Sequence, residues 1–340
     1  MFKKYYLFCF LFLLGCSEYQ DKNPLSCFKS DPVRLVATTI PTDKPVLFGG
    51  TVALIEDTLL AIQTYQEDTL LTFINVLNGK TVKRMVSRGR GPGEMIIISF
   101  CSQTNKNQLW VYDPNQPGVH FIDHQVITTN ALYKPFMKLR SADLFKIDTC
   151  FVASGHSVHN HRFQIFDSKG NTVDTCLHYQ KPGIYQKIPD HIYSTGYQGW
   201  YTVHPDNNKF VFAASSAGRF QIFDFVKNTI QPKVDLFFWD PVLREENRVC
   251  ILDRQSKIGF QDVDSNQQFI YTLYSGKTKA NYLDEPTTSH LLVFDWDGNP
   301  VKRYLLDTSV WSFCMNEAGT KLYGVAFMPE TTIVQYDLNP

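Results

Sequence analysis

The 340 residues include 33 lysines and arginines against 33 aspartates and glutamates, so the formal net charge is zero. A balanced chain lacks the basic field that attracts nucleic acid, and we expect no nucleic-acid partner. The 26 phenylalanines and 17 tyrosines favour β-strands, and the length suits either several domains or one large all-β domain.

Residues 1–15 have the pattern of a bacterial export signal. Two lysines, Lys3 and Lys4, precede an apolar run of roughly ten residues, which is shorter than the about 20 that cross a bilayer. The following Leu13-Leu14-Gly15-Cys16 resembles a lipobox, which implies that Cys16 carries the lipid of the mature protein. Ser17, where inner-membrane lipoproteins often have aspartate, favours the outer membrane. The alternative is an ordinary signal peptide with a chance cysteine.

We therefore expect an exported outer-membrane lipoprotein that faces the periplasm or the cell surface. Residues 16–32, which begin with a polar stretch, are predicted to be its tether. Six further cysteines are widely spaced and form no CxxC pair, which argues against a zinc ribbon. These are Cys27, Cys101, Cys150, Cys176, Cys250 and Cys314. Buried free thiols and disulfides both fit this spacing, and the pairing stays open.

From residue 33 to residue 340 the chain consists of short β-rich segments separated by turn residues. One pattern repeats: "RFQIFDSKGNTV" (162–173), "RFQIFDFVKNTI" (219–230) and "HLLVFDWDGNPV" (290–301). Looser copies lie at 70–82, 118–127 and 331–338. Each copy is third in a unit of four predicted strands, so the sequence predicts a six-bladed β-propeller of four-stranded antiparallel blades.

Two details of this prediction concern the second and the sixth blade. In the second, strands are expected over 95–102 and 126–132. The sixth lacks a fourth strand, and "VRLVATT" (33–39) is left over before the first blade. This N-terminal strand is predicted to close the ring, which would remove the last open sheet edge.

The segment "GRGPGEM" (89–95), followed by "QLWVYD" (108–113) and "VHFID" (119–123), resembles the glycine turn and strand pair of NHL-type repeats. Together with the blade pattern, it makes the chain similar to TolB-like and NHL-type six-bladed propellers. Met95 stands where those repeats usually have an aromatic residue, and only one blade has the glycine turn. A nucleotide loop would open a helix, whereas a strand is expected after Met95. The resemblance implies the fold, and several such propellers are enzymes.

Loop lengths distinguish the two rims of the predicted ring. Short turns at 105–108, 168–171, 205–209, 297–300 and 316–321 would lie on one rim. Three long segments, 179–199, 240–256 and 275–289, would lie on the other. Because long loops in a compact domain usually have a function, this long-loop rim is the predicted binding face.

Three sets of side chains on that rim are candidate site residues. His156, His159 and His161 could hold a divalent metal, although a closed zinc site needs about four ligands. The carboxylates Glu94 and Asp143 would lie near the channel mouth, and Glu94 could instead pair with an arginine. The remaining candidates, for stacking on a ligand or for local packing of the loop, are Arg88, Arg90, Tyr185, His191, Tyr193, Tyr197, Trp200 and Tyr201.

Common catalytic motifs such as GxSxG, HExxH and the Walker loop do not occur in the sequence. We therefore predict a monomeric, non-catalytic binding or scaffold module that takes a protein or glycan ligand at the long-loop rim. It needs no cofactor and contacts the membrane through its lipid alone. The alternative is a metal-dependent propeller enzyme, such as a lactonase, a lyase or a glycan-acting enzyme, which uses the central channel. A purely structural envelope component is a third possibility.

Overall fold

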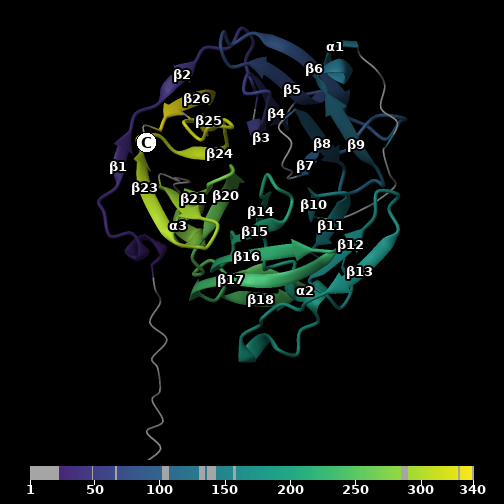
Figure 1. Ribbon diagram of the computed structural model, residues 1–340, viewed down its shortest axis with the longest axis vertical. Coiled ribbons are helices and arrows are strands. Elements are labelled where there is room, and N and C mark those ends of the chain that lie inside the picture. The colour runs from purple at the N-terminus through teal and green to yellow at the C-terminus, as the bar shows by residue number, and fades with distance from the viewer. Residues whose placement is uncertain are drawn as a thin grey trace, which may run out of the picture.

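The computed structural model describes residues 23–47, 49–65, 67–101, 107–129, 135, 143–155, 158–284, 290–327 and 330–338. Six blades surround a central axis, and Figure 1 looks along the shortest dimension of the molecule. The first strand of each blade lies nearest the axis. The predicted six-bladed, all-β propeller is therefore confirmed. The export signal and Cys16 lie outside the described residues.

Four blades contain four consecutive antiparallel strands each. Blade 1 consists of β3 (Gly49–Ile55), β4 (Leu59–Thr64), β5 (Thr69–Asn75) and β6 (Thr81–Ser87). Blade 3 consists of β10 (Asp143–Ile147), β11 (Cys150–Ser154), β12 (Phe163–Phe166) and β13 (Thr172–Cys176). Blade 4 consists of β14 (Gly199–Val203), β15 (Lys209–Ala214), β16 (Gly218–Val226) and β17 (Thr229–Trp239). Blade 5 consists of β20 (Phe260–Ser265), β21 (Phe269–Tyr274), β22 (His290–Asp295) and β23 (Pro300–Leu306).

Burial follows the position of a strand within its blade. All residues of β4 and β11 are buried, because each blade stacks face to face with both neighbours and its middle strands have no solvent side. The outer strand β13 has three exposed residues among its five. The continuous apolar segments of the repeat thus correspond to middle strands, because a strand that is buried on both faces has apolar side chains at successive positions.

Blade 2 differs from the prediction. Its sheet has three strands, β7 (Ser99–Cys101), β8 (Gln108–Tyr112) and β9 (Val119–Asp123). The prediction of a strand over 126–132 is wrong, because the helix α1 (His124–Thr129) follows β9. Asp123 Oδ1 accepts a hydrogen bond from Val126 N at 2.8 Å, which is the N-cap interaction that starts a helix.

The N-terminal segment runs along the outside of the last two blades. β1 (Val33–Leu35) pairs in parallel with β23, as a fifth strand of blade 5. β2 (Thr38–Ile40) pairs antiparallel with β26 (Thr331–Asp337) of blade 6, whose other strands are β24 (Val310–Met315) and β25 (Lys321–Phe327). The single strand predicted over 33–39 is therefore two short strands on two blades, and closure of the ring by it stays a prediction.

Residues 23–32 are part of the folded propeller, whereas the sequence analysis assigns them to the tether. The short helix η1 (Pro24–Cys27) is capped by Asn23, whose Oδ1 accepts from Leu25 N at 3.0 Å. Phe28 is buried, and its ring lies 5.3 Å from that of Phe294 in blade 5. The apolar side chain of Phe28 packs into the groove between blades 4 and 5, together with its neighbours Leu25 and Cys27.

No helix among the described residues is long and apolar enough to cross a membrane. All six cysteines downstream of Cys16 are free thiols. Burial raises the pKa of Cys176 to about 11 and also raises that of Cys250. These thiols are therefore small apolar side chains in the packing rather than reactive groups.

Replacing Phe28→Ala should lower the free energy of unfolding by about 3 kcal/mol, because a buried ring is lost and a cavity is left. Urea unfolding measures this change. Lys29→Ala, at an exposed neighbouring position, is the matched control and should have little effect. Equal stability of the two variants would show that residues 23–32 are not part of the folded unit.

Candidate binding site at the long-loop rim

The three long segments contain secondary structure of their own. The first holds the turn η2 (Gly183–Tyr185) and the helix α2 (Asp190–Tyr193). The second forms a hairpin of β18 (Leu243–Glu246) and β19 (Val249–Leu252), and the third contains α3 (Lys279–Asp284). Figure 1 places α2 and β18 next to one another beside blade 4. The segment 285–289, part of the predicted third loop, lies outside the described residues.

Side chains of the neighbouring segments cover both edges of the hairpin. Tyr185 Oη accepts from Leu243 N at 2.9 Å and donates to Leu243 O at 3.2 Å. Thr195 Oγ1 accepts from Cys250 N at 2.7 Å and lies 3.1 Å from Cys250 O. Lys279 Nζ donates to Leu252 O at 3.0 Å. Because an isolated hairpin leaves unpaired backbone groups at both edges, these contacts unite the segments 179–198, 240–258 and 275–284 into one unit, the rim layer.

Three of the predicted ligand-facing aromatics are packed inside this layer. Tyr193 has no exposed surface, and Tyr185 and Tyr197 are also buried. The rings of Tyr193 and Tyr197 stack at 5.4 Å, and Tyr197 lies 5.7 Å from Phe212 of blade 4. Burial raises the pKa of Tyr197 to about 12. These rings pack the rim layer onto the blades and do not present faces to a ligand. Of the two roles considered for them, the structure therefore shows local packing.

The histidines near the rim form two stacked pairs. The ring of His159 lies 4.7 Å from that of His191, and the ring of His161 lies 5.1 Å from that of His178. His178 Nδ1 is 2.9 Å from Asp190 Oδ2. Among the described residues, no group of three histidine, cysteine or acidic side chains is placed to hold a metal ion. His156 lies outside the described residues, so the metal site predicted at His156, His159 and His161 stays a prediction.

The glycine turn joins blade 1 to blade 2. Gly89 N donates to Met95 O at 2.9 Å, and Met95 N donates to Ser87 O at 3.1 Å. Glu94 Oε2 accepts from Gly91 N at 2.8 Å, so the turn's own backbone, rather than an arginine, binds this carboxylate. A Cβ atom on Gly89 would lie 1.9 Å from Glu94 Oε2, so another residue there would displace the carboxylate.

The two arginines of the turn are both exposed on the long-loop rim. Arg88 Nη2 donates to Tyr65 O at 2.6 Å, which ties the turn to the neighbouring loop of blade 1. After the turn, Ile96 N donates to Asp113 Oδ2 at 2.6 Å. The backbone at 95–98 is therefore not the strand that the sequence predicts, because a side chain rather than a neighbouring strand takes the Ile96 hydrogen bond.

A cavity of about 420 Å³ occupies the centre of the ring, lined mainly by the innermost strands. Its lining includes three carboxylates, Asp143, Asp262 and Asp264, and none of the described lining residues is a lysine or an arginine. Burial raises the pKa of Asp143 to about 7, and burial likewise raises that of Asp262 to about 7. Trp200 and Tyr201 of β14, which the sequence analysis assigns to the long-loop rim, also line this cavity.

A second cavity of about 440 Å³ lies between the rim layer and blades 4 and 5. Thr195, β19, Gln261 and Lys279 contribute to its walls. Gln198 and Ser215 line both cavities, so the two cavities adjoin at these residues. We call the two cavities together the rim groove. Sequence reasoning missed Gln198, Ser215 and Gln261, because no motif marks residues that meet only in the fold.

Backbone hydrogen bonds hold the junction between the two cavities. Ser215 N donates to Gln198 O at 2.9 Å, and Gly259 N donates to Ser215 O at 2.9 Å. A Cβ on Gly259 would lie 2.2 Å from Ala217 O and 2.5 Å from Ala214 O. Only glycine allows the start of β20 to approach blade 4 this closely.

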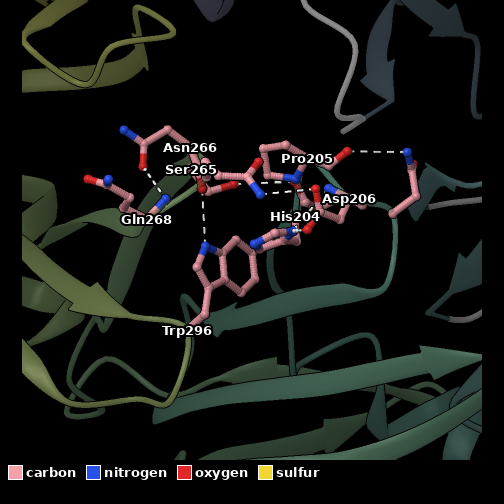
Figure 2. Close-up of polar contacts among 10 residues, drawn as sticks. His204, Pro205, Asp206, Ser265, Asn266, Gln268 and Trp296 are labelled. Atoms are coloured by element: carbon pink, nitrogen blue, oxygen red, sulfur yellow. Dashed lines mark hydrogen bonds and ion pairs between the residues drawn. The ribbon is translucent and has the colours of Figure 1, made fainter.

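The opposite rim is built differently. Figure 2 shows its turns linked by small polar contacts: Trp296 Nε1 donates to Asn266 O at 3.1 Å, and Asp206 N donates to His204 Nδ1 at 3.0 Å. The rings of His204 and Trp296 meet edge to face at 4.6 Å. Burial lowers the pKa of His204, so it is a neutral acceptor in this network. Short turns tied in this way give a fixed surface.

Replacing Gly259→Ala should lower the free energy of unfolding by about 1–3 kcal/mol, because the added methyl group meets backbone oxygens that cannot move aside. Gly183→Ala, in η2 of the same rim layer, is the matched control, since nothing lies within 4 Å of its Cβ position. Chemical unfolding of both variants measures the difference. Similar stabilities would contradict the close approach of the two blades.

The raised pKa of Asp143 predicts a pH dependence of stability. An unfolded aspartate titrates at about 3.9, whereas Asp143 in the fold titrates at about 7. Between these values the folded protein binds more protons than the unfolded chain, so the free energy of unfolding falls as the pH rises. The substitution Asp143→Asn should make the slope of the free energy of unfolding against pH less steep, by the contribution of about one bound proton.

Urea unfolding at several pH values between about 5 and 7.5 measures this slope. Part of the slope should remain in the Asp143→Asn variant, because Asp262 also contributes to it. Asp148→Asn is the matched control, since it removes an exposed carboxylate from the turn that follows β10 and should leave the slope unchanged. A slope that is the same in Asp143→Asn as in the original protein would contradict the assignment.

Comparisons with known proteins give the family and the fold. No curated protein matches the sequence. The WD40 repeats of RRP9 and the structure of U3-55K are both similar to this chain, each with a TM-score of 0.50 and 10% sequence identity. Both comparisons cover 89% of this chain, with 97% of the first structure and 98% of the second. At this identity they support the propeller fold alone. The family model described as "TolB-like 6-blade propeller-like" matches residues 51–318, and the chain belongs to this family.

Proposed function

We propose that this protein is an exported, lipid-anchored binding module of the outer membrane that takes a neutral glycan chain in its rim groove. The observation that carries the proposal is that two cavities of similar volume adjoin at Gln198 and Ser215. Each cavity has a volume within the range of about 300–1,000 Å³ that is typical of ligand sites. Two adjoining cavities suit an extended ligand that contacts both, rather than a compact one.

The chemistry of the groove favours a neutral ligand with many hydroxyl groups. Its walls present amides and hydroxyls at Gln63, Gln198, Gln261, Ser215 and Ser216. Trp200, which lines the central cavity, supplies aromatic surface on which the apolar face of a sugar ring can stack. The central cavity carries carboxylates and no cation among its described residues, which disfavours phosphate and other anions.

Export and lipid attachment at Cys16 rest on the sequence pattern of residues 1–16. The rim groove needs no catalytic group to bind a glycan, and we assign it binding rather than turnover. A metal-dependent enzyme is the second candidate, favoured by the two carboxyls Asp143 and Asp262 that titrate at about 7 in the central cavity. A stoichiometric divalent ion in the purified protein would favour that candidate.

Replacing Trp200→Ala should weaken the binding of neutral oligosaccharides at least about tenfold, or 1.4 kcal/mol, through loss of the stacking surface. Isothermal titration calorimetry with a panel of short neutral oligosaccharides measures the affinities. Trp200→Phe retains an aromatic face and should recover part of the affinity, which separates stacking from loss of folding.

Ile184→Ala is the matched control, since Ile184 is exposed in the same rim layer and is not part of the walls described for either cavity. It should bind as the original protein does. If no oligosaccharide binds while extended peptides do, the ligand is a protein segment and the glycan assignment is wrong.

A further inference from the structure

The folded chain begins at the long-loop rim. Asn23, the first described residue, accepts a hydrogen bond from Tyr274 Oη at 3.4 Å. Tyr274 ends β21 at the point where the 275–284 segment of the rim layer begins. A Cβ on Gly276 of that segment would lie 2.6 Å from the same hydroxyl. The polypeptide therefore enters the propeller beside the rim layer and not beside the short turns.

The distance from this entry point to Cys16 is limited by the covalent chain. Cys16 precedes Asn23 by seven residues. Seven fully extended residues reach at most about 25 Å. If Cys16 carries the lipid, as the proposed function has it, the long-loop rim near blades 4 and 5 lies within this distance of the membrane surface.

Exposed apolar side chains are present on the same rim. Ile184 is 81% exposed, and Val249 and Ile251 of the hairpin, which line the second cavity, are also exposed. The full set of large exposed apolar residues on this rim is Leu47, Tyr65, Ile184, Val242, Val249, Ile251 and Trp311. Aliphatic and aromatic side chains interspersed with lysines and arginines are typical of surfaces that lie in the membrane interface.

Charge also distinguishes the rim layer from the turns of the opposite rim. The rim layer has eight cationic residues and six acidic ones. The cationic residues are Lys181, Lys187, Arg244, Arg248, Arg254, Lys257, Lys277 and Lys279. In the described turns of the opposite rim, seven carboxylates outnumber three lysines. Those carboxylates are Glu56, Asp57, Asp148, Asp167, Asp206, Asp297 and Glu317. An anionic lipid surface repels the acidic rim and accepts the rim layer.

We propose that the long-loop rim is the membrane-facing side of the propeller and rests on the lipid surface that holds the Cys16 anchor. This inference rests on the lipid attachment in the proposed function, and it does not depend on which ligand the groove binds. In this orientation the rim groove opens toward the membrane, and the glycan that reaches it is one displayed on the membrane surface.

The lipidated full-length protein, reconstituted in vesicles of phosphatidylethanolamine and phosphatidylglycerol, tests this orientation. A fluorescent amino acid replaces Ile184 on the rim layer or, as the matched position, Leu77 on the opposite rim, which is 75% exposed. Energy transfer to an acceptor on the lipid headgroups should be clearly stronger from position 184. Equal transfer, or stronger transfer from position 77, would overturn the proposal.

Two further measurements separate the possible failures. Cys16→Ala should remove the lipid mass from the protein and lower the energy transfer at both positions. If the original protein carries no lipid, both the anchor and the orientation are wrong, while oligosaccharide binding by calorimetry still tests the groove by itself. The vesicles contain no other protein. A rim layer that does not approach them would therefore show that this surface does not bind the membrane, and would point to a protein partner instead.

Discussion

The contact on which the inner ring most depends is the buried carboxylate of Asp262. Its Oδ2 accepts from Ser312 Oγ at 2.6 Å and from Phe313 N at 2.9 Å, both in the first strand of blade 6. Ser312 Oγ in turn accepts from Val52 N of blade 1 at 3.2 Å. One side chain of blade 5 therefore orders the inner strands of the next two blades. Removing water from this carboxylate costs free energy, and the hydrogen bonds offset part of that cost.

Similar links recur around the axis and explain why the central cavity keeps its shape. Thr202 Oγ1 of blade 4 lies 2.8 Å from Ser265 Oγ of blade 5, and Tyr112 Oη of blade 2 accepts from Leu144 N of blade 3 at 3.2 Å. Between these points the blades meet through apolar packing, which is strong but not directional. Polar contacts on the inner strands fix the register of neighbouring blades. The walls of the rim groove are therefore set before any ligand arrives.

The sequence predicted the repeated part of the fold because each blade buries the same pattern of apolar side chains. The six copies located the third strands, and the predicted alternation of short and long connections separated the two rims. The prediction failed where a local interaction outweighed the pattern. Asp123 caps a helix in place of a strand in blade 2, and Phe28 packs into the groove between blades 4 and 5. The cap joins residues only three apart but was hidden by the strand pattern, whereas Phe294, the partner of Phe28, is distant in the sequence, so spacing could not reveal that contact.

The candidate site was less predictable than the fold. Aromatic residues in a long loop suit both a ligand and the core, and only burial separates the two roles. Tyr193 and Tyr197 pack inside the rim layer, whereas Trp200, a few residues later, lines the central cavity. The difference arises because Trp200 belongs to β14, whose place next to the axis is set by the whole ring. The amides of Gln198 and Gln261 come from segments about 60 residues apart, which only the closed fold brings together.

The rim layer connects the groove to the proposed membrane contact. The strand β19 of the hairpin lines the second cavity, and two of its lining residues, Val249 and Ile251, are also exposed to solvent. One short strand thus serves two surfaces, and its edge is held by Thr195 and Lys279. A shift of this hairpin toward or away from the blades would change the depth of the groove and the exposed apolar surface together. In the proposed orientation, the hairpin therefore couples the groove to the surface that faces the membrane.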